Sequence, residues 1–128
     1  MSARPLVLCL EDDPFVLKAL VLMLKALDCD VLSARTAEEA LGYAREGAIR
    51  LDILLADVIL PVMDGVKVYQ AIKRAQPGMD AMFISGTSRE ALIAGKDLPP
   101  EAPYLQKPFG FDGLEACLLP LMARQECA

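Results

Sequence analysis

Polar residues that can do chemistry follow four short apolar runs of this 128-residue chain. Glu11 and Asp12 come directly after the first of these runs (6–10), and Asp57 ends the second (53–57). Ser85 follows the third (80–84), and Lys107 follows the last (104–106). Each residue alone has an ordinary explanation, because acids and serines after strands usually cap helices or form turns, and a single lysine is usually solvated. Taken together, they are a set of acids, a hydroxyl and an amine that points to a shared site.

This set fits the transfer of a phosphoryl group. Carboxylates that crowd together repel one another, and a hard divalent cation with oxygen ligands relieves this, Mg²⁺ being the usual intracellular choice. A metal held in that way leaves coordination positions for phosphoryl oxygens, to which Lys107 offers a positive charge and Ser85 a hydrogen bond. Asp57 is then predicted to be a carboxylate nucleophile that accepts the phosphoryl group.

Strands and helices must alternate along the chain to position these residues. Short apolar runs bounded by turn residues predict buried parallel strands, and the periodic apolar segments between them, which open with caps such as Asp13 and Thr36, predict helices. Strands are expected at 6–10, 30–34, 53–57, 80–84 and 104–106, and helices at about 14–27, 36–47, 66–75, 88–94 and 110–123. The pattern predicts one doubly wound α/β domain over residues 1–128, a three-layer sandwich. The carboxyl ends of its parallel strands share one edge, so the polar residues should converge there.

Prolines predict two irregularities in this scheme. Residues 95–103 contain three prolines and cannot form a regular helix, so they should be a stiff loop. Pro120 should kink or shorten the last helix, in which Cys117 is expected to face inward.

Composition excludes several classes of function. The net charge of −5 and the lack of a basic run argue against nucleic-acid binding, and no apolar segment is long enough to span a membrane. The four cysteines form no metal-type pairing, and the N-terminus shows no cleavable signal, so we expect a cytoplasmic protein with reduced thiols. The sequence has no histidine, which removes imidazole triads, the usual zinc sites and a role as a histidine phosphocarrier.

The sequence resembles the response-regulator receiver domains of bacterial two-component and phosphorelay signalling over essentially its whole length. The motifs that carry the resemblance are highly specific as a set: LEDDP at 10–14, LLADVILPVMDG at 54–65, FISG at 83–86 and YLQKPF at 104–109. The resemblance implies a flavodoxin-like (βα)5 fold with strand order 2-1-3-4-5 and a cis bond between Lys107 and Pro108.

The resemblance also implies a role for each site residue. By position, it implies that Asp57 is the phosphoacceptor and that Ser85 and Lys107 contact its phosphoryl group. It implies that Mg²⁺ is held by Glu11, Asp12, Asp57 and the backbone carbonyl of Ile59. Tyr104 is then the switch residue, which moves when Ser85 is drawn toward the phosphoryl group. The donor is a phosphohistidine of a sensor histidine kinase or histidine phosphotransfer protein. By the same resemblance, the chain is expected not to be an enzyme, although it assists its own phosphorylation and dephosphorylation. Its fourth helix, fifth strand and fifth helix are expected to form the surface that changes on phosphorylation and meets a downstream protein, which the sequence does not identify.

Two features depart from the usual receiver pattern. The proline-bearing loop replaces the end of the fourth helix, which disfavours the dimerisation that many relatives use on that face and favours a surface specialised for a kinase or phosphotransferase. Ile59, two residues after Asp57, has no polar group to orient an attacking water, so slow self-dephosphorylation is expected.

Alternatives remain at this point. The chain ends near the end of the receiver pattern with no output domain, which fits a stand-alone regulator or the receiver of a hybrid histidine kinase. A pseudo-receiver would act as a docking module without phosphorylation, although every core site residue is present. A flavodoxin-like nucleotide binder would need a phosphate loop after the first strand, where acids stand instead. An aspartyl-phosphate hydrolase would need an acid at position 59.

Overall fold

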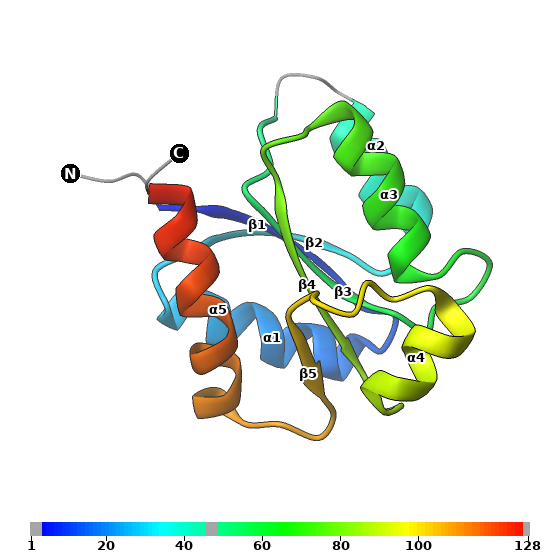
Figure 1. The fold of residues 1–128 in the computed structure, drawn as a ribbon. Helices are drawn as coiled ribbons and strands as arrows, with labels where there is room; N and C mark the ends of the chain where they lie inside the picture. The colour runs from blue at the N-terminus through cyan, green and yellow to red at the C-terminus, as the bar shows by residue number, and fades with distance from the viewer. Residues whose placement is uncertain (1–3, 46–48, 127–128) are drawn as a thin grey trace.

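In the part of the chain that the structure describes, five parallel strands form a single sheet at the centre of the molecule (Figure 1). The computed structural model describes residues 4–45 and 49–126. The strand order is β2-β1-β3-β4-β5, which confirms the predicted doubly wound topology. The strands are β1 (Leu6–Leu10), β2 (Asp30–Ala34), β3 (Ile53–Asp57), β4 (Asp80–Ser85) and β5 (Tyr104–Gln106).

Within the described ranges, five helices cover the two faces of the sheet (Figure 1). They are α1 (Pro14–Ala26), α2 (Ala37–Arg45), α3 (Gly65–Ala75), α4 (Arg89–Lys96) and α5 (Phe111–Glu126). The buried residues of α2, α3 and α4 belong to one hydrophobic core, and those of α1 and α5 belong to the other. The three-layer sandwich predicted from the sequence is therefore confirmed.

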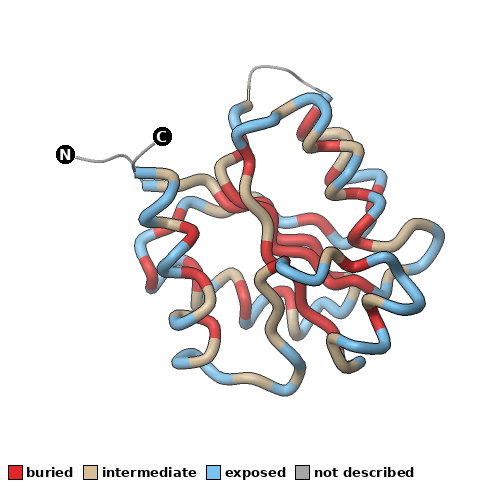
Figure 2. The backbone as a smooth tube through the Cα atoms, viewed as in Figure 1, coloured by how far each residue is buried: buried red, intermediate tan, exposed pale blue. Residues whose placement is uncertain are grey.

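The strands alternate between the two cores because successive side chains of a strand point to opposite faces. Leu8 and Leu10 of β1 pack on the side of α2 and α3, whereas Val7 and Cys9 pack on the side of α1 and α5. All five residues of β3 are buried, as the red centre of Figure 2 shows. Each fully buried Leu or Ile side chain contributes about 1.5–3 kcal/mol, so this strand is held firmly.

The element boundaries differ from the prediction in α4 and α5. Helix α4 continues through Gly95 to Lys96 and ends at Asp97, which adopts a left-handed conformation, so the irregular loop begins two residues later than expected. Helix α5 is not shortened by Pro120, which lies inside it on an exposed position. Cys117 is partly buried and packs against the core on the side of α1, as its predicted inward orientation requires.

The last turns of α5 form because tertiary contacts outweigh the cost of the proline. Leu121 is buried in the core, Arg124 pairs with Asp80 at 2.9 Å, and the Gln125 side-chain amide donates to the Gly78 carbonyl at 3.1 Å. The remaining differences are of one residue at strand or helix ends, and the predicted end of the second helix at residue 47 lies outside the described residues. Among the described residues, none of the helices combines the length and hydrophobicity that crossing a lipid bilayer requires.

Val62 carries local backbone strain in the loop between β3 and α3. Its φ is 72°, and its side chain is fully exposed. A β-branched residue in the left-handed region is disfavoured because its Cβ approaches the following carbonyl, and exposure means that no burial compensates.

We expect Val62→Gly to raise the free energy of unfolding by about 1 kcal/mol, because glycine adopts positive φ without this penalty. Urea unfolding followed by circular dichroism measures the change. Val62→Ala keeps a Cβ atom and serves as the control, with a smaller gain or none. A Val62→Gly protein less stable than the parent would contradict the left-handed conformation.

Candidate functional site

Asp57 lies at the carboxyl end of β3, the strand between β1 and β4. The residue is 5% exposed, and both of its carboxylate oxygens have hydrogen-bond donors. Oδ1 accepts from the backbone N–H of Ile59 at 3.0 Å, and Oδ2 accepts from Nζ of Lys107 at 2.7 Å. These contacts fix the orientation of the carboxylate at the edge of the sheet.

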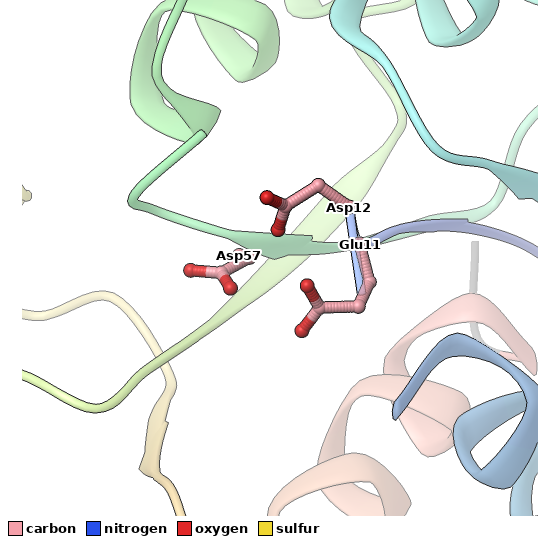
Figure 3. A group of neighbouring side chains, drawn as sticks. All are labelled: Glu11, Asp12 and Asp57. Atoms are coloured by element: carbon pink, nitrogen blue, oxygen red, sulfur yellow. The ribbon is translucent and has the colours of Figure 1, made fainter. Parts of the chain in front are cut away.

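Two more acids reach the same place from the neighbouring strand. Leu10 of β1 pairs in register with Ala56 of β3, so the residues that follow β1 lie beside Asp57. Glu11 is fully buried and Asp12 is partly buried. One carboxylate oxygen from each of Glu11, Asp12 and Asp57 lies within 4.8 Å of the others, and Figure 3 shows the three side chains grouped at the strand ends. Three hard oxygen donors this close suit a small divalent cation.

Lys107 provides the positive charge of the site. It follows β5, and its Nζ donates to the carboxylates of both Glu11 and Asp57. Burial works to lower the pKa of Lys107, but the hydrogen bonds to Asp57 and Glu11 outweigh this and raise it, so the amine stays charged. The bond between Lys107 and Pro108 is cis, as predicted.

The charge of Lys107 does not fully offset the burial of the Glu11 carboxylate. Burial raises its pKa from 4.5 to about 7, although the hydrogen bond from Lys107 works in the opposite direction. Between these two values the folded chain holds a proton that the unfolded chain releases, so this group makes the fold less stable as the pH rises from 4.5 to about 7. A site that gathers carboxylates at this cost fits a bound cation.

Ser85 ends β4 at the same edge, where Ile84 pairs in register with Asp57. The residue is buried, and its Oγ accepts a hydrogen bond from the backbone N–H of Thr87 at 3.1 Å. Tyr104 lies on the neighbouring strand β5, and its hydroxyl donates to the carbonyl of Thr87 and lies 3.1 Å from that of Ser85. The serine and the aromatic residue are therefore joined through the turn that follows β4.

The structure brings the residues predicted for the site to one edge of the sheet, and their individual roles stay predictions. Glu11, Asp12, Asp57 and Lys107 form one contiguous cluster. Ile59 is 46% exposed and contacts the cluster through its backbone N–H, so the ligand role of its carbonyl stays a prediction.

Sequence reasoning missed two residues that shape the site. Gly65 is the last residue of the motif at 54–65 and was given no role of its own, yet a Cβ atom there would lie 2.2 Å from the backbone oxygen of Asp57, so only glycine fits. Arg89 was not predicted to have a role, although its guanidinium carbon lies 5.5 Å from the centroid of the Tyr104 ring. The glycine could have been found from its place in the LLADVILPVMDG motif, whereas nothing in the sequence marks this arginine.

Comparison with known proteins agrees with this geometry. Residues 7–118 match the model of the response regulator receiver domain. The response regulator receiver protein CpdR of Brucella abortus is 31% identical over 103 residues, which cover 80% of this chain and 84% of CpdR. The sensor kinase CckA of the same organism is 28% identical over 128 residues, but the chain spans only 13% of that protein.

Solved structures show the same fold. The receiver domain of the hybrid histidine kinase CckA superposes with a TM-score of 0.75 at 28% identity, covering 91% of this chain and 98% of that one. A response regulator receiver protein from Sinorhizobium medicae gives a TM-score of 0.83 at 22% identity and covers 96% and 98%, which supports the fold alone. The family match over most of the chain, the CpdR similarity and the acidic edge of the sheet agree, and the chain belongs to the response regulator receiver domain family.

Proposed function

We propose that the chain receives a phosphoryl group on Asp57 from the phosphohistidine of a sensor histidine kinase or a histidine phosphotransfer protein. The observation that carries the proposal is the position of Asp57, which is held by Ile59 and Lys107 beside Glu11 and Asp12. Known relatives include a receiver protein and a sensor kinase, which supports a donor of this kind.

The transfer step uses the carboxylate as a nucleophile. An oxygen of Asp57 forms a bond to phosphorus while the bond between phosphorus and the donor's imidazole nitrogen breaks, and that nitrogen keeps the electron pair. Lys107 already touches Asp57, so its charge is in place to stabilise the negative charge that builds up on the phosphoryl oxygens. Ser85 would donate a hydrogen bond to one of these oxygens after its contact with Thr87 rearranges.

Glu11, Asp12 and Asp57 are proposed to hold Mg²⁺, with the backbone carbonyl of Ile59 as a further ligand. Their clustering and the raised pKa of Glu11 support this assignment. When bound, the cation would neutralise charge on the carboxylates and the incoming phosphoryl group. Lys107 shares two of these carboxylates, so the lysine and the cation would divide the same negative charge.

Phosphorylation is proposed to act as a local electrostatic switch. It adds about −1.5 to −2 charges at the edge of the sheet. Ser85 and Lys107 would reorganise around this charge, and Tyr104 would follow because its hydroxyl contacts the turn after Ser85. The surface of α4, β5 and α5 would then present a changed shape to a partner protein.

We place the protein in the cytoplasm, as a signalling phosphoacceptor rather than an enzyme that acts on other substrates, with protein partners and no role in binding nucleic acid or membrane. The net charge of −5 supports the exclusion of nucleic acid.

Incubation with Mg²⁺ and acetyl phosphate should add the mass of one phosphoryl group, because a small donor needs only the assembled site. Intact-mass spectrometry measures the adduct. Asp57→Ala and omission of Mg²⁺ should each abolish it, whereas the exposed-acid control Asp112→Asn should leave it unchanged. A protein that forms no adduct and does not bind Mg²⁺ would instead be a pseudo-receiver.

Lys107→Ala should lower the free energy of unfolding by about 2 kcal/mol without Mg²⁺, because the buried carboxylates lose their positive partner. The lysine is 24% exposed, which keeps the loss below that of a fully buried pair. Saturating Mg²⁺ should recover part of the loss. Urea unfolding with and without Mg²⁺ measures both effects, and the exposed control Lys67→Ala should show neither.

Ile59→Asn should speed the loss of the phosphoryl group on the order of tenfold or more, because an amide there can orient the attacking water. The decay of the adduct, followed by intact mass after removal of acetyl phosphate, gives the rate. Val62→Asn, in the same loop but fully exposed, is the matched control with an unchanged rate. Equal rates in the parent and Ile59→Asn would show that residue 59 points away from the phosphoryl group.

A further inference from the structure

The loop between α4 and β5, residues 97–103, is held in a defined shape. We call it the proline loop, because three of its seven residues are prolines. Leu98 and Ala102 are buried, and the backbone N–H of Ala102 donates to the Pro99 carbonyl at 3.0 Å. At its end, the Pro103 carbonyl accepts from the backbone N–H of Phe83 at 2.9 Å. Figure 1 shows the loop in yellow, running from α4 to β5.

Arg89, the first residue of α4, binds the middle of the proline loop. Its Nη1 donates to the carbonyl of Pro100 at 3.0 Å and to that of Ala102 at 2.8 Å. The same guanidinium lies over the ring of Tyr104, 5.5 Å from its centroid. A planar, forked guanidinium can make both kinds of contact at once, which an ammonium does poorly.

Tyr104 connects this arginine to the acceptor site. Its hydroxyl donates to the carbonyl of Thr87 and lies 3.1 Å from that of Ser85. Thr87 in turn donates to Oγ of Ser85, the residue expected to contact the phosphoryl group. A continuous series of contacts therefore runs from Ser85 through Thr87 and Tyr104 to Arg89 and the proline loop.

One side of the proline loop borders a cavity. The cavity has a volume of about 230 Å³ and is lined by Pro99, Glu101 and Pro103 of the loop and by Tyr69 and Lys73 of α3. Packed protein interiors resist small displacements, whereas a segment that borders an open cavity can be displaced at lower cost.

We propose that Arg89 is a positioning residue that couples Tyr104 to the proline loop, so that a phosphoryl group on Asp57 changes the exposed face of this loop. This inference rests on the proposed function and extends it by naming the segment that changes and the residue that links it to the site. Coupling of this kind is reciprocal, so the position of the loop also influences the acceptor site.

The test uses the full chain labelled with ¹⁵N, with beryllofluoride and Mg²⁺ as the phosphoryl mimic. The prolines have no N–H, so the loop is observed through the amides of Leu98, Glu101 and Ala102, and the site through those of Gly86 and Thr87. In the parent protein both groups of resonances should shift. In Arg89→Gln, Gly86 and Thr87 should still shift, whereas the shifts of the loop amides should be lost.

Lys96→Gln is the matched control, because it removes the same charge from the other end of α4, where the side chain is exposed. It should behave as the parent does. Tyr104→Leu interrupts the contacts one step earlier and should also abolish the loop response, which keeps the test valid if Arg89→Gln folds poorly.

Three results would overturn the inference. Loop amides that still shift in Arg89→Gln would show that the signal does not pass through this arginine, and loop amides that stay fixed in the parent while Thr87 shifts would show that the loop does not respond. Site amides that fail to shift in the parent would overturn the proposed function itself, and the inference with it.

Discussion

Burying Glu11 and Asp57 side by side would cost too much free energy unless a positive charge accompanied them. Lys107 meets this requirement from a third strand end, and it ties β1, β3 and the turn after β5 into one electrostatic unit. The buried carboxylates need the lysine, and the lysine is placed by the parallel pairing of the strands. The electrostatic surroundings of Asp57 thus depend on the order of the strands in the sheet.

The sequence was enough to predict the fold and the clustering of polar residues at one edge of the sheet, because the relevant signals are local. Buried parallel strands read as apolar runs, and polar residues at their ends mark the shared edge. The end of α5 was not predictable in this way, because the cost of Pro120 is visible locally, whereas the contacts of Leu121 and Arg124 that outweigh it come from distant parts of the chain.

The same limit explains why Arg89 was missed. It lies in the first turn of a short helix, and its partners are two backbone carbonyls and a ring on the next strand. Carbonyl acceptors leave no trace in a sequence, since every residue has one. Gly65 differs, because only glycine fits against the backbone oxygen of Asp57 and this glycine is part of the recognisable motif at 54–65.

The position of each strand in the sheet has a mechanical consequence. β3 is paired on both sides and fully buried, so the strand that bears Asp57 is stiff, whereas β5 has three residues and a neighbour on one side only. If Asp57 is phosphorylated as proposed, the added charge would be accommodated more easily by displacement of β5 than of β3. Under the proposed function, substitutions in β5 could alter what a partner protein contacts while the surroundings of Asp57 stay the same, so the two regions could evolve separately within one small domain.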